Sequence, residues 1–167
     1  MRAAVCTRYG PPEVLRIEEL TTPAPRKNDV RIRILATTVT SSDCYVRGLA
    51  LSPAYRMMAR LALGWNGPRQ PILGMVLSGV VDSIGAKVSS FAVGDSVFGF
   101  DRHLFGTYAQ YVCWPEDGLL ATRPDSITDE EAAAIPYGGL IACHLVRKAD
   151  VRAGQRVLVF GASGAVG

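Results

Sequence analysis

The first two thirds of the chain consist of short apolar runs separated by turn residues, a pattern typical of β-strands. In residues 30–36, aliphatic side chains occupy every second position, at Val30, Ile32, Ile34 and Ala36. This period of two predicts a strand with one buried face. Further strands are predicted over residues 3–6, 14–17, 75–84, 96–100 and 106–114, with a bulge or a close backbone approach at Gly79. Many short strands at regular spacing indicate a mainly β fold of the barrel type.

Helix signals replace the strand pattern after Pro124. Residues 128–131, Thr-Asp-Glu-Glu, form a capping box in front of three alanines, which predicts the start of a helix. Pro136 is expected to interrupt this helix, and a second helix is predicted from about residue 139 to residue 149. The apolar run over residues 155–160 predicts a buried strand that leads into a glycine-rich turn. Because this order is typical of a parallel α/β sheet, we place a domain boundary between residues 125 and 126.

One segment inside the β region predicts a short amphipathic helix. Over residues 52–64, the apolar Met57, Met58 and Leu61 are interleaved with Arg56 and Arg60. The favoured interpretation is that the apolar face packs on the barrel. A lid over an apolar substrate and contact with a membrane surface are the alternatives.

The glycine-rich turn predicts a dinucleotide-binding site. Its residues are Gly161, Ala162, Ser163, Gly164, Ala165, Val166 and Gly167. Small residues after a strand allow the backbone to approach a pyrophosphate, and the amides of a following helix would face the phosphate charge. The spacing differs from the standard fingerprint, since Ala162 stands where its first glycine would be. A plain strand-to-helix turn is the alternative.

Composition and charge exclude several other classes of protein. Hydrophobic residues make up 49% of the chain and charged residues 20%, which is typical of globular domains. The net charge of +3 is scattered, so nucleic acid is not an expected partner. No apolar run approaches the roughly 20 residues of a membrane span, and no signal-peptide core is present, so we expect a cytoplasmic protein without a membrane partner. The cysteines show no metal or redox spacing and are expected to be buried free thiols: Cys6, Cys44, Cys113 and Cys143.

Five short motifs follow one another in an order that resembles the N-terminal half of a medium-chain dehydrogenase/reductase. Asp43, Tyr45 and Arg47 form an Asp-x-Tyr-x-Arg motif after an early strand. The other four motifs lie in residues 71–85, 91–97, 106–111 and 161–167. Within this superfamily, the chain is similar to the zinc-independent quinone oxidoreductase (zeta-crystallin-like) branch.

The resemblance implies a fold and a reaction. Residues 1–125 would form a GroES-like, partly open β-barrel that carries the substrate site. Residues 126–167 would contain the opening helices, first strand and glycine turn of a truncated Rossmann domain. The implied reaction transfers hydride from NADP(H), which is favoured over NAD(H), to a quinone or an α,β-unsaturated carbonyl. We expect the full-length protein to be a homodimer and this chain alone to be inactive.

No zinc site is expected. In the related zinc alcohol dehydrogenases, metal ligands stand at positions that correspond to Thr40, Met75 and Val76. A hydroxyl, a thioether and an aliphatic side chain do not make a zinc site, and His103 and His144 are expected to be surface or packing residues. Without a Lewis acid, the favoured substrate is a small apolar molecule that is already electrophilic.

Hydroxyl groups are the expected catalytic groups, at Tyr45 and Ser42. As donors they would stabilise the negative charge that develops on the substrate oxygen, and the resemblance assigns the Tyr45 position to substrate contact. The alternative for Tyr45 is a packed ring with a solvated hydroxyl. Thr40 falls where relatives often have an asparagine near the nicotinamide. Arg47 is expected either to bind a cofactor phosphate or to form an ion pair.

Two other functions remain open. The chain could be a non-catalytic, stand-alone GroES-like binding domain, and a zinc-type alcohol dehydrogenase is the more distant alternative. The apolar run over residues 155–160 favours the enzyme, because a stand-alone domain would gain nothing from an unpaired, adhesive strand.

Overall fold

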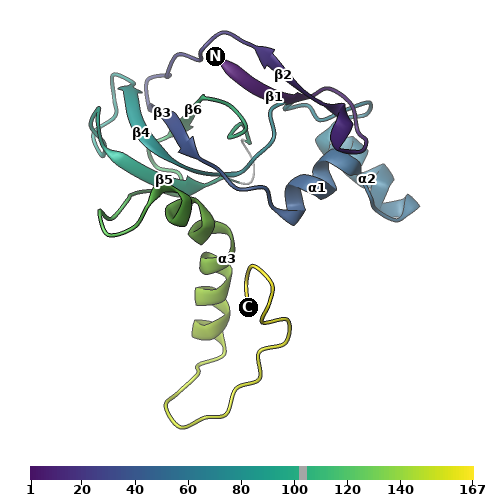
Figure 1. Cartoon of the computed structure of the whole chain (residues 1–167), viewed down its shortest axis with the longest axis vertical. Coiled ribbons are helices and arrows are strands. Elements are labelled where there is room, and N and C mark those ends of the chain that lie inside the picture. Colours follow the sequence, from purple (N-terminus) through teal and green to yellow (C-terminus); the bar gives the residue numbers. More distant parts are fainter. Residues whose placement is uncertain (102–104) are drawn as a thin grey trace.

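The computed structural model describes residues 1–101 and 105–167 and contains two antiparallel sheets (Figure 1). The small sheet pairs β1 (Arg2–Cys6) with β2 (Leu15–Glu19), and the single-turn helix η1 (Pro12–Val14) lies between them. The large sheet has the order β6-β3-β4-β5-β7. Its strands are β3 (Asp29–Ala36), β4 (Val76–Ile84), β5 (Ser96–Phe100), β6 (Tyr111–Pro115) and β7 (Leu120–Thr122). The predicted mainly β fold is confirmed.

The larger hydrophobic cluster of the core lies on one face of the large sheet, as the period of two in β3 predicts. The buried side chains come from four strands and are Val30, Ile32, Leu77, Val81, Val97, Val112 and Trp114. Within the described residues, the edge strands β6 and β7 each have one partner strand, so the barrel is partly open. The isolated bridges Ala3–Ala109 and Val5–Ile72 connect the small sheet to the loops beside the large one.

Gly79 marks a close approach of two backbones, as predicted. It stands opposite Ile34, and a Cβ atom at position 79 would lie 2.2 Å from the carbonyl oxygen of Arg33. The register shifts between Ile34 and Ala36, so the bulge lies on β3. The sequence pattern therefore predicted the position of the close approach, while the extra residue of the bulge lies on the partner strand β3.

The strand predicted over residues 106–114 is wrong in its first half, since only β6 forms. Residues 106–110 bond to several segments instead of to one ladder. The Tyr108 N–H donates to the Leu73 carbonyl (3.0 Å), and the Tyr108 carbonyl accepts from the Ala4 N–H (2.7 Å). Gly106 has φ of +101°, which only glycine adopts readily, and it turns the chain away from the extended path.

The longest helix, α3 (Asp129–Lys148), begins at the predicted capping box and passes through Pro136 without a break. The predicted interruption is wrong. A proline removes one backbone hydrogen bond, which a helix survives when packing holds the adjacent turn. Here Ala132 and Ala133 are buried, and Asp129 accepts a hydrogen bond from Ser78 of β4 (2.7 Å). The rest of α3 projects away from the barrel, and the C-terminal segment runs back along it (Figure 1).

The amphipathic segment forms α2 (Pro53–Leu63), which follows α1 (Ser41–Gly48). The interpretation that its apolar face packs on the barrel is wrong, because Met57, Met58 and Leu61 are all more than half exposed. In the described part of the chain, no helix combines the length and the apolar character that a membrane crossing requires.

The cysteines are less buried than expected. Only Cys6 is buried, where burial raises the pKa of its thiol; Cys44 and Cys143 are exposed. Cys113 is half-buried on β6, where burial raises the pKa of its thiol to about 11.

Candidate active site

Helix α1 carries the predicted catalytic residues and is fixed at its start by a capping box. The Thr40 N–H and the Thr40 hydroxyl both donate to Asp43 Oδ2, at 2.8 and 2.7 Å. The Asp43 N–H donates back to Thr40 Oγ1 at 3.4 Å. Such reciprocal bonds satisfy amides that have no partner inside the helix. The backbone N–H and the hydroxyl of Thr40 are therefore both used in capping α1. A contact between Thr40 and a nicotinamide stays a prediction.

Asp43 of α1 is buried, and its carboxylate affects the pKa of Tyr108. The phenol of Tyr108 donates to the Thr38 carbonyl at 3.5 Å. Burial first, and then the Asp43 carboxylate, raise the pKa of Tyr108 well above its ordinary value. Tyr108 therefore stays neutral and supports the start of α1 from the barrel side.

Ser42 and Tyr45 stand one turn apart on α1, so they share a face of the helix. Ser42 Oγ lies 2.8 Å from the phenol oxygen of Tyr137 on α3. The Tyr137 ring packs edge-on against Phe100 of β5, with 6.0 Å between the ring centroids. The structure therefore joins α1, α3 and β5 at one point.

The Tyr45 side chain is 56% exposed and lines an open groove of about 650 Å³. The other lining residues come from α1 and the η1 loop and are Gly10, Pro11, Ser41, Cys44, Arg47, Gly48 and Ala50. The alternative of a packed Tyr45 ring is not what the structure shows. The ring is accessible to a small molecule in this groove.

Arg47 is hydrogen-bonded to Gly10, which also lines this groove. Its guanidinium donates to the Gly10 carbonyl at 2.7 Å, and the Gly10 N–H donates to the Arg47 carbonyl at 3.0 Å. Among the described residues, Arg47 is in no ion pair, so the ion-pair interpretation is wrong. Its binding to a cofactor phosphate stays a prediction, while the structure shows a role in positioning the Gly10 loop.

The strand predicted over residues 155–160 is not formed. Leu158 and Phe160 are 91% and 99% exposed, and the segment is irregular. A strand needs a neighbour to take up its backbone groups, and no strand of the described residues lies beside this one. Residues 161–167 form successive turns, with bonds from the Gly164 N–H to the Gly161 carbonyl (2.9 Å) and from the Gly167 N–H to the Gly164 carbonyl (3.2 Å).

The turn nevertheless lies close to the candidate site. Gly138 follows Tyr137 on α3, and a Cβ atom at position 138 would meet the Ala165 carbonyl oxygen at 1.8 Å. The C-terminal segment therefore touches α3 directly behind the Ser42–Tyr137 pair. The roles of its individual residues in phosphate binding stay predictions.

The positions that hold zinc in related enzymes do not fit a metal. The Thr40 hydroxyl is occupied by Asp43, while Met75 and Val76 are core residues with 4% and 0% exposure. Over residues 1–101 and 105–167, the structure has no cluster of three or more histidine, cysteine, aspartate or glutamate side chains suited to a metal ion. His144 is exposed on α3, and His103 lies outside the described residues.

We expect purified protein to contain zinc far below one ion per chain, because the three ligand positions offer no thiolate, imidazole or carboxylate. Elemental analysis of protein prepared without chelator measures this, with a zinc-dependent alcohol dehydrogenase as the positive control. A stoichiometric zinc content that survives dialysis would show that other residues form a metal site.

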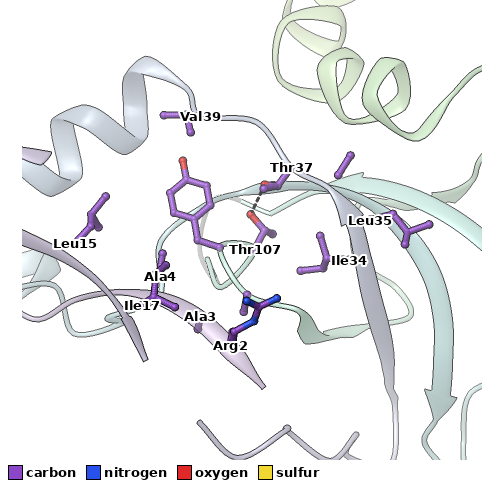
Figure 2. Close-up of a pocket in the computed structure, with 13 residues that line it drawn as sticks. Arg2, Ala3, Ala4, Leu15, Ile17, Ile34, Leu35, Thr37, Val39 and Thr107 are labelled. Carbon is purple, nitrogen blue, oxygen red and sulfur yellow. Dashed lines mark hydrogen bonds between the residues drawn. The ribbon is translucent and has the colours of Figure 1, made fainter. Parts of the chain in front are cut away.

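A second groove, of about 570 Å³, lies between the small sheet and β3 (Figure 2). Apolar residues dominate its lining, among them Ala4, Leu15, Ile17, Ile34 and Val39. In its wall, Thr37 Oγ1 donates to the Val76 carbonyl (2.6 Å), so Thr107 is the donor in the 2.9 Å bond between the two threonines. Both hydroxyls are satisfied, and this groove shares no lining residue with the Tyr45 groove.

Sequence reasoning missed Tyr137 and Phe100. Neither belongs to a motif, and Tyr137 falls in the break predicted between the two helices. Only the packing of α3 against β5 and α1 places them beside Ser42.

Comparison with known proteins decides the family. The model of the alcohol dehydrogenase GroES-like domain matches residues 26–125, more than half of the chain. The chain belongs to this family. The GroES-like barrel predicted from the sequence is thereby confirmed, and the match ends near the predicted boundary at residue 125.

Relatives of this GroES-like chain include quinone oxidoreductases. The one from Mus musculus is 34% identical over 169 residues, which covers 100% of this chain and 47% of the relative. A solved quinone oxidoreductase from Escherichia coli in complex with NADPH has a TM-score of 0.72 at 27% identity, over 89% of this chain and 41% of that one. The human synaptic vesicle membrane protein VAT-1 homolog-like protein has a TM-score of 0.83 at 28% identity, over 99% and 49%. The chain spans about half the length of the curated relatives it matches.

These likenesses confirm the resemblance to the quinone oxidoreductase branch of the medium-chain dehydrogenases/reductases, which is an oxidoreductase family.

Proposed function

We propose that this chain provides the substrate side of a zinc-independent oxidoreductase that reduces a quinone or an α,β-unsaturated carbonyl. The observation that carries this proposal is the pair of hydroxyls on one face of α1, with Tyr45 open to a groove and Ser42 bonded to Tyr137. The relatives named quinone oxidoreductase, one of them solved with NADPH, support the same class of reaction and cofactor.

The chain's own groups would act on the substrate oxygen. NADP(H), or else NAD(H), supplies the hydride when bound. Tyr45 would donate its phenol proton in a hydrogen bond to the substrate oxygen, where negative charge develops. Ser42 is outside the lining of the Tyr45 groove. When Tyr137 donates to Ser42 Oγ, the Ser42 proton is free to make a second such bond to a substrate that extends beyond this groove, so Tyr137 is a positioning residue for Ser42.

The glycine turn is suited to a pyrophosphate by its small residues. Gly161 has φ of +78°, and nothing lies within 4 Å of a Cβ built there, so the space on that side of Gly161 is open. We propose that residues 161–167 bind the cofactor once residues 155–160 pair with further strands of a Rossmann domain that begins near residue 126. A homodimer in the cytoplasm is part of the same proposal.

In the whole protein, Tyr45→Phe should lower kcat and kcat/KM together, because the lost donor acts mainly in the transition state. A single oxyanion donor is worth about 10²–10³ in rate at a well-formed site. We expect an effect on the order of tenfold for a quinone, which needs little activation, and a larger effect for an enone. Steady-state kinetics with NADPH and both acceptors measure this.

A rise in KM alone would mean that the Tyr45 ring contributes only uniform binding. A greater loss with the quinone than with the enone would contradict the role of the hydroxyl. The absence of any hydride transfer, combined with tight binding of an apolar ligand, would favour the non-catalytic binding domain instead.

A further inference from the structure

The apolar side of α2 has no partner in this structure. Tyr55, Met57, Met58 and Leu61 are 68%, 55%, 67% and 61% exposed, and Trp65 just after the helix is 55% exposed. Globular proteins rarely expose a large apolar patch without a use for it. We call Tyr55, Met57, Met58, Leu61 and Trp65 the α2 apolar surface.

The orientation of α2 is the reverse of that of an ordinary surface helix. Its partly buried positions are Ala59, Arg60 and Leu63. Met57, Met58 and Leu61 have the spacing of one helical stripe, and this stripe faces solvent. The fold therefore presents the apolar stripe outward.

The charged residues along this segment of the chain have a single sign. Residues 44–81 contain Arg47, Arg56, Arg60 and Arg69 and no aspartate or glutamate. The exposed Arg56 and Arg69 donate to the carbonyls of Leu51 and Leu61, both at 3.1 Å. These bonds hold the guanidinium groups near the helix without neutralising them, and neither arginine is in an ion pair among the described residues.

We propose that α2 lies flat on an anionic lipid surface, with the α2 apolar surface at the boundary between headgroups and acyl chains. Apolar side chains that include a tryptophan, bordered by arginines, are the signature of an interfacial helix. Arginines near an anionic leaflet add electrostatic attraction. This replaces the sequence-based expectation of no membrane partner, because that expectation rested on spanning segments and assumed a packed helix.

Other partners for the α2 apolar surface are less compatible with the arginines near it. A second copy of the chain would bring the same arginines against these arginines, which is repulsive. A lid over a neutral substrate has no need of nearby arginines, and the groove lined by Tyr45 contains no α2 side chain. The proposal is independent of the redox function, since it concerns binding to lipid without turnover.

Trp65, which belongs to the α2 apolar surface, is an intrinsic fluorescent probe for lipid binding. Trp65 is exposed, whereas Trp114, the other tryptophan, is 2% exposed in the core. With phosphatidylcholine vesicles containing phosphatidylglycerol, the protein should co-sediment and its Trp65 fluorescence should shift to the blue. With phosphatidylcholine alone, both signals should be at least roughly tenfold weaker.

Two charged double variants locate the contact. Met58→Glu with Leu61→Glu should reduce the fraction bound to anionic vesicles by roughly tenfold or more. Leu158→Glu with Phe160→Glu adds the same two charges to another exposed apolar segment and should leave binding unchanged. Circular dichroism melts confirm that both variants fold.

Three results would overturn the proposal. One is equal binding to neutral and anionic vesicles, or to neither. Another is loss of binding in the Leu158/Phe160 variant rather than in the Met58/Leu61 variant. The third is a concentration-dependent doubling of mass by light scattering, without lipid, that the Met58/Leu61 variant abolishes, since this would assign the surface to a second copy.

Discussion

Gly79→Ala should lower the free energy of unfolding by about 3 kcal/mol, which corresponds to a fall in Tm of roughly 6–12 °C for a chain of this size. The added methyl group would lie 2.2 Å from the Arg33 carbonyl oxygen, with Ile32 Cγ2 at 3.1 Å. The oxygen belongs to the backbone of β3, so relief requires the strands β3 and β4 to separate at the centre of the large sheet. Thermal denaturation followed by circular dichroism measures the effect.

Gly48→Ala is the matched control. It adds the same methyl group in α1, where the nearest atom, the Gly10 carbonyl oxygen, is 3.8 Å away. Alanine in a helix is favoured over glycine by about 0.5–1 kcal/mol, so Tm should stay constant or rise slightly. Equal losses in the two variants would mean that the close approach at Gly79 does not constrain the sheet.

The 167-residue chain by itself should show no NADPH-dependent reduction of quinones above the rate without protein. In the structure, residues 155–160 form no strand, and Val157, Leu158, Val159 and Phe160 are 55–99% exposed. The glycine turn therefore has no strand to hold it against a pyrophosphate, and the hydride donor would not be oriented toward the Tyr45 groove. Because orientation supplies much of the rate in such reactions, we expect complete loss.

The measurement compares NADPH oxidation by the chain and by the whole protein at equal concentrations, with a quinone and an enone. Quenching or blue-shift of NADPH fluorescence reports cofactor binding separately. Turnover by the chain alone that disappears in Tyr45→Phe would show that residues 1–167 already assemble a working site.

Local sequence patterns were sufficient wherever one segment determines its own conformation. The period of two in β3, the capping box at Thr128 and the crowding at Gly79 depend on residues near one another in the chain or on a single neighbouring strand. The motif around Asp43 and Tyr45 likewise lies within one helix. These features gave the barrel, the family and the face of α1 that carries the hydroxyls.

The failures came from contacts that no local pattern encodes. Pro136 was expected to break α3, but burial of Ala132 and Ala133 against the barrel holds the helix across it. Residues 155–160 have the composition of a strand, yet a strand requires a partner, and in this structure they have none. The hydrogen bond from Arg47 to the Gly10 carbonyl was not expected from the sequence, because it joins α1 to a loop 37 residues away.

The sequence by itself determined most of the strands, the start of α3 and the resemblance to an oxidoreductase family. Only the tertiary structure decided that Ser42 meets Tyr137, because a hydrogen bond between residues 95 positions apart depends on how α3 docks on β5. It also decided that the apolar side of α2 faces outward. Amphipathic periodicity shows that a helix has an apolar side, while the packing of the connecting segments determines which way that side points.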